Sequence, residues 1–395
     1  MATRLSATQL RAILVLASFM TAMAVAAYYL VSGSGSVVAE PRPASAVEGA
    51  SRDLALFRGE VLVWADGGFS DGEVGRIRDS VRVAQISAVR TGFLPVAGPD
   101  AAYPVIPVET MAVDPRAYAA AVGRSGTRLA AMLEHGVVLS RTGASLRKLR
   151  AGDPLELAGG VTLRVRGVVD DHVLGGYEAA VSADRGASLG ITRAAYALVR
   201  PRGPLDTLRI SVGRLLGGRR LVFRLPDART WFRAGDGTLP LAQVKARFGE
   251  FAVKRLADPA PSPAWAEASL ATRTIPVLGE VRCHRLILDD LSAAMAELQR
   301  QRLDRLVDTA AFHRAGGCLG AAHAGPPGAI GPPSAAGSGL SSLDWGIGLD
   351  LTAGGDGPGR ADQRLVAVMG RHGFTWGGRW PRRRSGHFEW VGEGA

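Results

Sequence analysis

The 395-residue sequence has few cysteines, few aromatic residues and a deficit of acidic residues. It contains 2 Cys, 6% aromatic residues and 36 Asp and Glu against 47 Lys and Arg, which gives a formal charge of +11. No zinc-finger spacing, RNA-binding aromatic motif or basic helix accompanies this charge, so we expect no nucleic-acid partner. An anionic surface, such as a membrane or a cell-wall polymer, accounts for the charge equally well. The sequence also lacks an HExxH motif, a P-loop and a dinucleotide-binding fingerprint.

A long apolar run stands at the N-terminus. Arg4 and Arg11 precede an uncharged stretch from Ala12 to about Val31, which is long enough to cross a bilayer. No clear small-residue cleavage site follows, which favours an uncleaved anchor over a cleaved signal peptide. The sequence therefore predicts a transmembrane helix over 1–32, a flexible stalk over 33–51 and a single-pass location in the cell membrane. In this prediction the C-terminal domains are extracytoplasmic.

The two cysteines, Cys283 and Cys318, lie in the C-terminal third of the chain. In an oxidising compartment they would pair in a disulfide and hold a loop against the helix before it. The alternative is two buried thiols in separate places.

Residues 52–205 are typical of a β-rich α+β extracytoplasmic module. EVLVWA, VRVAQISAV and YPVIPVETMAV have strand lengths and apolar patterning, and DPLELAGGVTLRVRGVVDD indicates a hairpin. The order of motifs in GVVLSRTGASLRKLRAGDPLELAGGVTLRVRGVVDD resembles the extracytoplasmic domains of MacB/FtsX-type transporter permeases. This resemblance implies a fold and not an activity. Residues 206–275 are predicted to form a strand-rich connector, and LDTLRISV at the junction is predicted to be a strand.

Residues 276–395 carry an ordered set of motifs. Ile287, Leu291, Met295 and Leu298 recur at helical spacing and predict an amphipathic helix. The motifs VRCHR, GGC, LSSLDWGIGLDL, RHGFTWGGRW and HFEW follow one another in an order that resembles D-Ala-D-Ala carboxypeptidase-like zinc peptidases. That family shares its fold with hedgehog signalling domains and acts on peptidoglycan stem peptides. The predicted fold class is therefore α+β, with an N-terminal transmembrane helix, a β-rich α+β middle module and a C-terminal D-Ala-D-Ala carboxypeptidase-like α+β domain.

The resemblance assigns roles to particular residues. Asp350 and His387 match two zinc ligands, and Ser341 matches the substrate-binding Ser that opens the motif. Leu343 stands at the position of the third ligand, a His, and offers no lone pair. Arg384 stands at the position of the general base and cannot accept a proton.

The resemblance also implies an arginine that binds the substrate carboxylate, but the segment after Cys318, LGAAHAGPPGAIGPP, contains none. The catalytic set is therefore incomplete. The sequence favours a membrane-anchored, peptidoglycan-directed zinc peptidase that is impaired, with doubtful zinc occupancy. Two alternatives stay open. In the first alternative, the chain is a non-catalytic protein that binds peptidoglycan or a partner through a pseudopeptidase domain. In the second, His323 replaces the missing zinc ligand in an active enzyme.

Overall fold

The computed structural model describes residues 60–122, 126–224, 237–319, 340–351, 361–380 and 383–392. The chain divides into two compact units, Met1–Arg42 and Pro43–Ala395, and every described residue belongs to the second unit.

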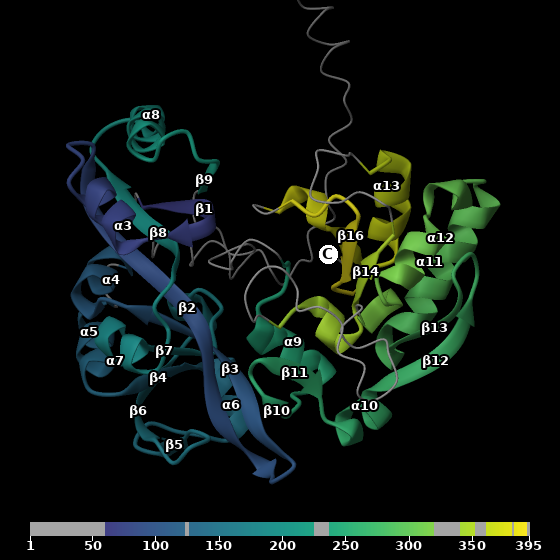
Figure 1. Ribbon diagram of the computed structural model, residues 1–395, viewed down its shortest axis with the longest axis horizontal. Helices are drawn as coiled ribbons and strands as arrows, with labels where there is room; N and C mark the ends of the chain where they lie inside the picture. Colours follow the sequence, from purple (N-terminus) through teal and green to yellow (C-terminus); the bar gives the residue numbers. More distant parts are fainter. Residues whose placement is uncertain are drawn as a thin grey trace, which may run out of the picture. The chain divides into compact units, whose positions relative to one another are not determined.

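The largest element is an eleven-stranded mixed sheet (Figure 1). Its strands are β1 (Val61–Phe69), β2 (Val83–Asp100), β3 (Tyr103–Val113), β4 (Val137–Ser140), β5 (Pro154–Glu156), β6 (Thr162–Val169), β7 (Ala179–Ser182), β8 (Ala194–Pro201), β9 (Leu221–Arg224), β10 (Val253–Arg255) and β11 (Asp258–Pro261). The order is β5-β6-β4-β7-β3-β2-β8-β1-β9, and β10 pairs with both β3 and β11. The pairs β3–β7 and β4–β6 are parallel. The expected hairpin is confirmed as the antiparallel pair β5–β6.

Short helices connect these strands, and side-chain caps fix where several of them begin. The Ser70 and Glu73 side chains form a capping box at the start of the first of these helices, and Ser140 and Ser182 accept backbone hydrogen bonds at the start of two others. The helices are α3 (Asp71–Arg78), α4 (Pro115–Val122), α5 (Gly126–Glu134), α6 (Arg141–Arg147), η2 (Asp171–Leu174), α7 (Ala183–Ser188), α8 (Leu205–Leu215), α9 (Leu241–Phe248) and α10 (Pro263–Ser269).

The strand prediction for LDTLRISV was wrong, because these residues lie in helix α8. Leu208, Val212 and Leu216 are buried at four-residue spacing, which is the period of a helix face and not of a strand. They pack in one apolar cluster with Val74 and Ile77 of α3 and with residues of β1 and β8.

The C-terminal part contains two small antiparallel sheets and a helical layer. Its elements are β12 (Leu270–Ile275), β13 (Gly279–His284), η3 (Arg285–Ile287), α11 (Leu288–Arg300), η4 (Asp304–Leu306), α12 (Thr309–Arg314), η5 (Gly317–Leu319), η6 (Ser342–Trp345), β14 (Gly348–Asp350), α13 (Gln363–Arg371), β15 (Phe374–Trp376), η7 (Gly377–Arg379) and β16 (His387–Trp390). Strands β12 and β13 form a two-stranded sheet, and the other has the order β14-β16-β15. The expected amphipathic helix is confirmed as α11, which buries Leu291, Met295 and Leu298.

The segment SSLDWGIGLD is only partly a strand. Ser342–Trp345 form the 3₁₀ helix η6, Gly346 adopts a left-handed conformation at φ 68°, and the strand is limited to Gly348–Asp350. A Cβ atom on Gly346 would lie 2.9 Å from the backbone nitrogen of His284. Glycine is therefore needed here both for the turn and for the close approach of β13.

The predicted fold class, an α+β protein with a transmembrane helix and a carboxypeptidase-like domain, was wrong beyond its α+β character. The structure is a mixed α+β protein, and across the described ranges no helix is both long and apolar enough to cross a membrane. The transmembrane helix expected over 1–32 and the stalk expected over 33–51 lie outside the described residues. The boundaries proposed at 205 and 275 stay predictions.

Candidate functional site

Strand pairing brings two of the predicted site residues together. Asp350 at the end of β14 is the direct partner of His387 at the start of β16. Asp350 Oδ1 lies 2.8 Å from His387 Nδ1. Register alone therefore produces this pair, because directly opposed residues on one face of an antiparallel ladder have neighbouring side chains.

Arg384, at the predicted base position, binds the same carboxylate. Its Nη2 lies 3.3 Å from Oδ1 and 3.2 Å from Oδ2 of Asp350. Burial opposes the charge of Asp350, but the hydrogen bond from His387 and the charges of His387 and Arg384 lower its pKa below the usual value. The guanidinium thus supplies the positive charge that the resemblance assigns to a metal ion.

The other ring nitrogen of His387 is also engaged. Its Nε2 lies 3.2 Å from Ser342 Oγ. In the neutral ring, a hydrogen on Nδ1 would donate to Asp350 and Nε2 would accept from the hydroxyl. The ring packs against Trp380 with 5.3 Å between the ring centroids.

Leu343, at the predicted position of the missing ligand, lies beside His387. A Cβ atom on Gly348 would lie 2.6 Å from Ser342 Oγ, 3.0 Å from Leu343 Cδ2 and 3.1 Å from His387 Cε1. These three side chains therefore converge over Gly348. A methyl group of Leu343 lies where the family resemblance predicts an imidazole.

Ser341 serves a local role in the structure. Its backbone nitrogen donates to Asp344 Oδ2 at 2.5 Å and its Oγ lies 3.1 Å from the same oxygen, which caps η6. Its substrate-binding role stays a prediction. His323, the alternative ligand, lies outside the described residues.

These residues do not fit a catalytic zinc ion, which needs three protein ligands and an open position. Within the part of the chain that the structure describes, no three His, Cys, Asp or Glu side chains are grouped so that they could hold a metal. Zinc binding by Asp350 and His387 alone stays a prediction for metal analysis to test.

Ser342, His387 and Asp350 follow the hydrogen-bond order of a serine-hydrolase triad. Ser342 is 6% exposed and His387 is 1% exposed, and the Ser342 hydroxyl packs against Gly348. A nucleophile must be reachable by the substrate, and this hydroxyl is covered. The chain of hydrogen bonds therefore holds η6 and β16 together.

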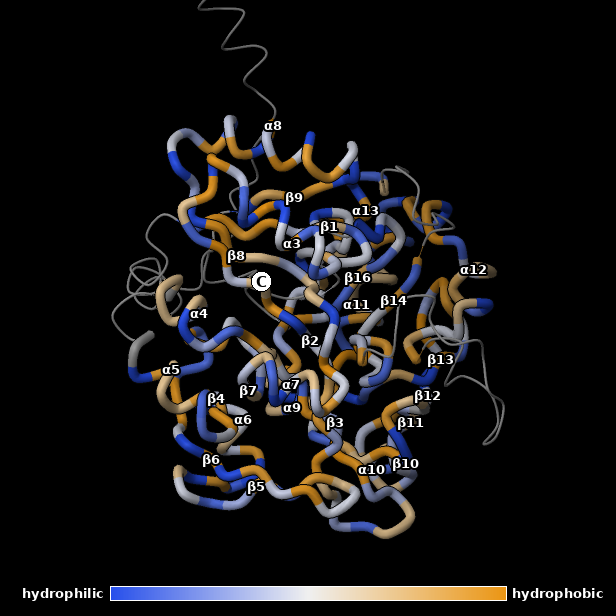
Figure 2. Tube along the Cα trace, turned by 60° about the vertical axis from the view of Figure 1, so that its left-hand side comes forward, coloured by the Kyte–Doolittle hydropathy of each residue, from blue (hydrophilic) through white to orange (hydrophobic). Residues whose placement is uncertain are grey.

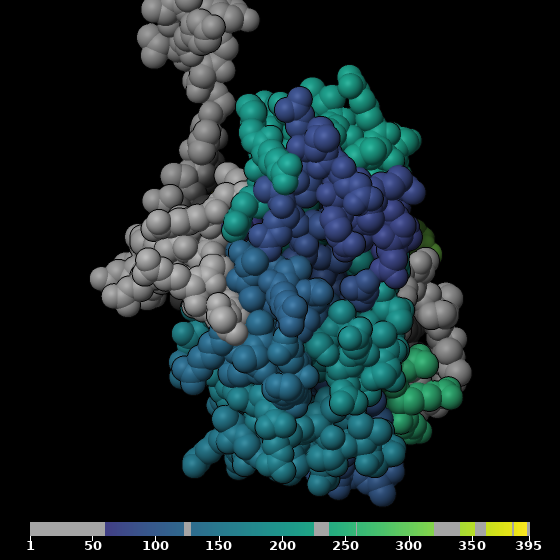
Figure 3. Space-filling view, turned by 90° about the vertical axis from the view of Figure 1, so that its left-hand side faces the viewer, coloured from purple at the N-terminus to yellow at the C-terminus, as the bar shows by residue number. Residues whose placement is uncertain are grey.

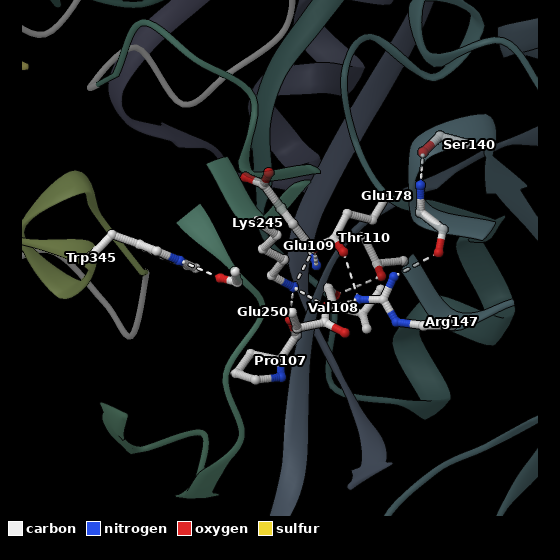
Figure 4. Close-up of polar contacts among 12 residues, drawn as sticks. Pro107, Val108, Glu109, Thr110, Ser140, Arg147, Glu178, Lys245, Glu250 and Trp345 are labelled. Carbon is white, nitrogen blue, oxygen red and sulfur yellow. Dashed lines mark hydrogen bonds and ion pairs between the residues drawn. The ribbon is translucent and has the colours of Figure 1, made fainter. Parts of the chain in front are cut away.

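A second polar cluster lies where α9 meets the large sheet (Figure 4). The Lys245 Nζ of α9 lies 2.7 Å from Glu178 Oε1 and 3.2 Å from Glu250 Oε1, and it also donates to the Pro107 carbonyl oxygen. Arg147 of α6 binds Glu178 Oε2 at 2.6 Å and also pairs with Glu250. Two cations thus match two carboxylates.

Glu178 and Lys245 are fully buried. Burial opposes the charge of Glu178, but the charges of Lys245 and Arg147, together with hydrogen bonds from Lys245 and the Glu109 backbone, lower its pKa below the usual value. Sequence reasoning missed this cluster because its members are far apart in the chain and form no motif. The nearest signal was Lys245, a charged residue among the apolar positions of α9.

Cys283 of β13 and Cys318 of η5 form a disulfide with 5.2 Å between their Cα atoms. Both residues are fully buried in the apolar cluster of the C-terminal part. The bond ties the two-stranded sheet to the segment that follows α12.

No family model matches the chain, and no curated protein matches it either. Among solved structures, the chain is similar to the periplasmic region of MacB from Actinobacillus actinomycetemcomitans, with 12% identity, a TM-score of 0.31, and coverage of 44% of this chain and 90% of that one. It is also similar to the extracellular domain of the noncanonic ABC-type transporter YknZ from Gram-positive bacteria, with 14% identity, a TM-score of 0.29, and coverage of 42% and 100%.

These findings correct the main functional interpretation. The interpretation as a zinc D-Ala-D-Ala carboxypeptidase acting on peptidoglycan was wrong, because no peptidase family model matches the chain and Arg384 binds the carboxylate that a zinc ion would need. The expected likeness to MacB-type domains is the part of the sequence resemblance that the comparison supports. One of the two solved structures is a periplasmic region and the other is an extracellular domain.

Proposed function

We propose that the protein is a non-catalytic binding protein that works outside the cytoplasm by binding a second protein. The closed cluster of Ser342, His387, Asp350 and Arg384 carries this proposal. Each group that would perform chemistry there is bonded to another member of the cluster. Ser342 and His387 are also buried, so these hydrogen bonds are suited to joining η6 to β16 and not to activating water.

The Cys283–Cys318 disulfide supports the extracytoplasmic part of the proposal. Disulfides form and persist in oxidising compartments and are rare in the cytosol.

The buried ion-pair cluster supports a role in binding. Arg147 ends helix α6 and Glu178 directly precedes β7, while Lys245 lies in α9 and Glu250 follows it. Removing one of these side chains would leave another charge buried without its partner, at a cost of about 3–5 kcal/mol. These ion pairs therefore hold α9 against the large sheet and α6, and a partner would bind them as one rigid unit.

The first part of the test measures catalysis. Purified protein is incubated with a peptidoglycan stem pentapeptide, with and without added zinc, and released D-Ala is quantified. We expect no release above that of the His387→Ala variant. Release that depends on His387 would overturn the proposal.

The second part identifies the partner. A photo-crosslinking amino acid replaces Val161 or Leu286, which are exposed residues of different parts of the fold. We expect a protein that is crosslinked in cells to form a stable complex with the purified chain, as measured by size-exclusion chromatography. Failure of every crosslinked protein to bind the purified chain would contradict a protein partner.

A further inference from the structure

Two segments far apart in the sequence, 78–82 and 202–215, form one surface. Ser80 Oγ lies 3.1 Å from Ser211 Oγ, and the Arg202 backbone nitrogen donates to the Arg82 carbonyl oxygen at 2.7 Å. Figure 3 shows the purple residues around α3 beside the teal residues around α8 on one face. We call these two segments the α3–α8 surface.

The α3–α8 surface is positively charged. Its two segments contain five Arg and two Asp, all exposed, which leaves a net charge of +3. Arg209 pairs with Asp206 at 3.2 Å, and Asp79 is the other carboxylate. Four arginines have no ion-pair partner among the described residues, and they are Arg78, Arg82, Arg202 and Arg214.

The same surface exposes apolar side chains. Val81 is 77% exposed, Ile210 is 56% exposed and Leu215 is 37% exposed. They are three of the six large apolar side chains exposed in the described part of the chain. Helix α8 is already anchored by Leu208 and Val212, so Ile210 is not needed for the core. Figure 2 shows hydrophobic and hydrophilic residues alternating along α8.

We propose that the α3–α8 surface binds an anionic phospholipid membrane. The arginine guanidinium groups would contact lipid phosphates, for which their planar donor pattern is suited. Val81 and Ile210 would enter the boundary between headgroups and acyl chains. This inference is independent of the proposed protein partner.

The composition favours a lipid surface over an acidic protein. The two segments contain no Phe, Trp or Tyr, whereas the energetic centres of protein interfaces are enriched in aromatic residues. Four arginines spread around exposed aliphatic side chains match a diffuse field of negative charge, as a membrane provides.

The test uses residues 43–395, which form one compact unit and leave out the apolar run Ala12–Val31, so that this run cannot itself bind lipid. Binding is measured by co-sedimentation with phosphatidylcholine vesicles, with and without phosphatidylglycerol. We expect binding to the anionic vesicles alone. It should weaken as ionic strength rises from about 0.1 M to about 1 M, where the screening length falls from about 10 Å to about 3 Å.

The variants locate the binding surface. Arg82→Glu with Arg202→Glu should weaken binding at least about 25-fold, since each basic residue near an anionic surface contributes about fivefold. Val81→Ser with Ile210→Ser should also weaken it at unchanged charge. The matched control is Arg282→Glu with Arg314→Glu, which makes the same change in charge at exposed sites elsewhere. This control variant should bind the anionic vesicles more strongly than the Arg82→Glu, Arg202→Glu variant.

Three outcomes would overturn the proposal. They are equal binding to neutral vesicles, equal losses in the test and control charge variants, and Arg82-dependent binding to polyglutamate in the absence of vesicle binding. The last outcome would assign the surface to an acidic protein. Unchanged melting temperatures of the variants show that any loss is a loss of binding.

Discussion

The guanidinium of Arg384 lies 3.2 Å from Asp350 Oδ2. A positively charged side chain thus forms an ion pair with the carboxylate that the family resemblance assigns to a metal ion. An arginine is always protonated, so it neutralises Asp350 without offering a coordination site.

We predict that the native chain binds no zinc with high affinity and that the double variant Leu343→His with Arg384→Asp binds one zinc per chain. The first change places an imidazole next to His387, where Leu343 Cδ2 now approaches Gly348. The second removes the competing cation. Isothermal titration calorimetry and metal analysis of both proteins measure the difference.

The control for the zinc prediction adds His387→Ala to the double variant and should abolish binding. A double variant that folds normally and stays free of zinc would show that the assignment of Leu343 and Arg384 to these positions is wrong.

We predict that Lys245→Met lowers the free energy of unfolding by about 3–5 kcal/mol, because it leaves Glu178 charged and buried beside one remaining cation, Arg147. Urea denaturation measures the loss. Lys254→Met is the matched control, because Lys254 is exposed and should change stability by less than about 1 kcal/mol. A small effect at Lys245 would mean that this cluster contributes little to joining α9 to the sheet.

Acid should destabilise the protein through Glu178 and Asp350. Both have lowered pKa values in the folded state. Their contribution is therefore complete above the pKa of the unfolded carboxyls, near 4, and is lost as the pH falls through the lower folded values. Urea denaturation between about pH 5 and pH 2 should show this fall.

The Glu178→Gln variant controls for acid effects elsewhere in the chain. It should be less stable at neutral pH and should lose less stability on acidification, because it lacks one of the two carboxyls. An identical pH profile in the variant and the native chain would exclude Glu178 as a source of the acid sensitivity.

We predict that Cys283→Ser with Cys318→Ser lowers the free energy of unfolding by about 2–4 kcal/mol, because the unfolded chain gains the freedom of the 35-residue separation between the two cysteines. Thermal unfolding of the native chain and of the double variant measures this difference in stability. A reductant should lower the melting temperature of the native chain and leave that of the double variant unchanged. A reductant effect on both proteins would point to a different cause.

Local patterns predicted the parts of the fold that depend on local periodicity. The spacing of Leu291, Met295 and Leu298 predicted α11, and the alternation in DPLELAGGVTLRVRGVVDD predicted the pair β5–β6. LDTLRISV failed because its eight residues satisfy both a strand and a helix pattern, and packing against α3 decided between them.

The candidate site was predictable only in part. Matching the HFEW and LSSLDWGIGLD motifs singled out Asp350 and His387, which the structure places opposite each other. The hydrogen bond from Ser342 could not be predicted, because it depends on a 3₁₀ helix in place of a strand. The buried pair of Lys245 and Glu178 depends on tertiary contacts alone.

The place of β1 in the sheet has a consequence for biogenesis. β1 is the first described strand in the chain, yet Val61 pairs with Val199 and Leu62 pairs with Arg224. A chain that emerges N-terminus first cannot complete this pairing until β8 and β9 have followed. The apolar strand sequence of β1 is exposed during that interval, so folding must begin elsewhere in the sheet and close around β1 late.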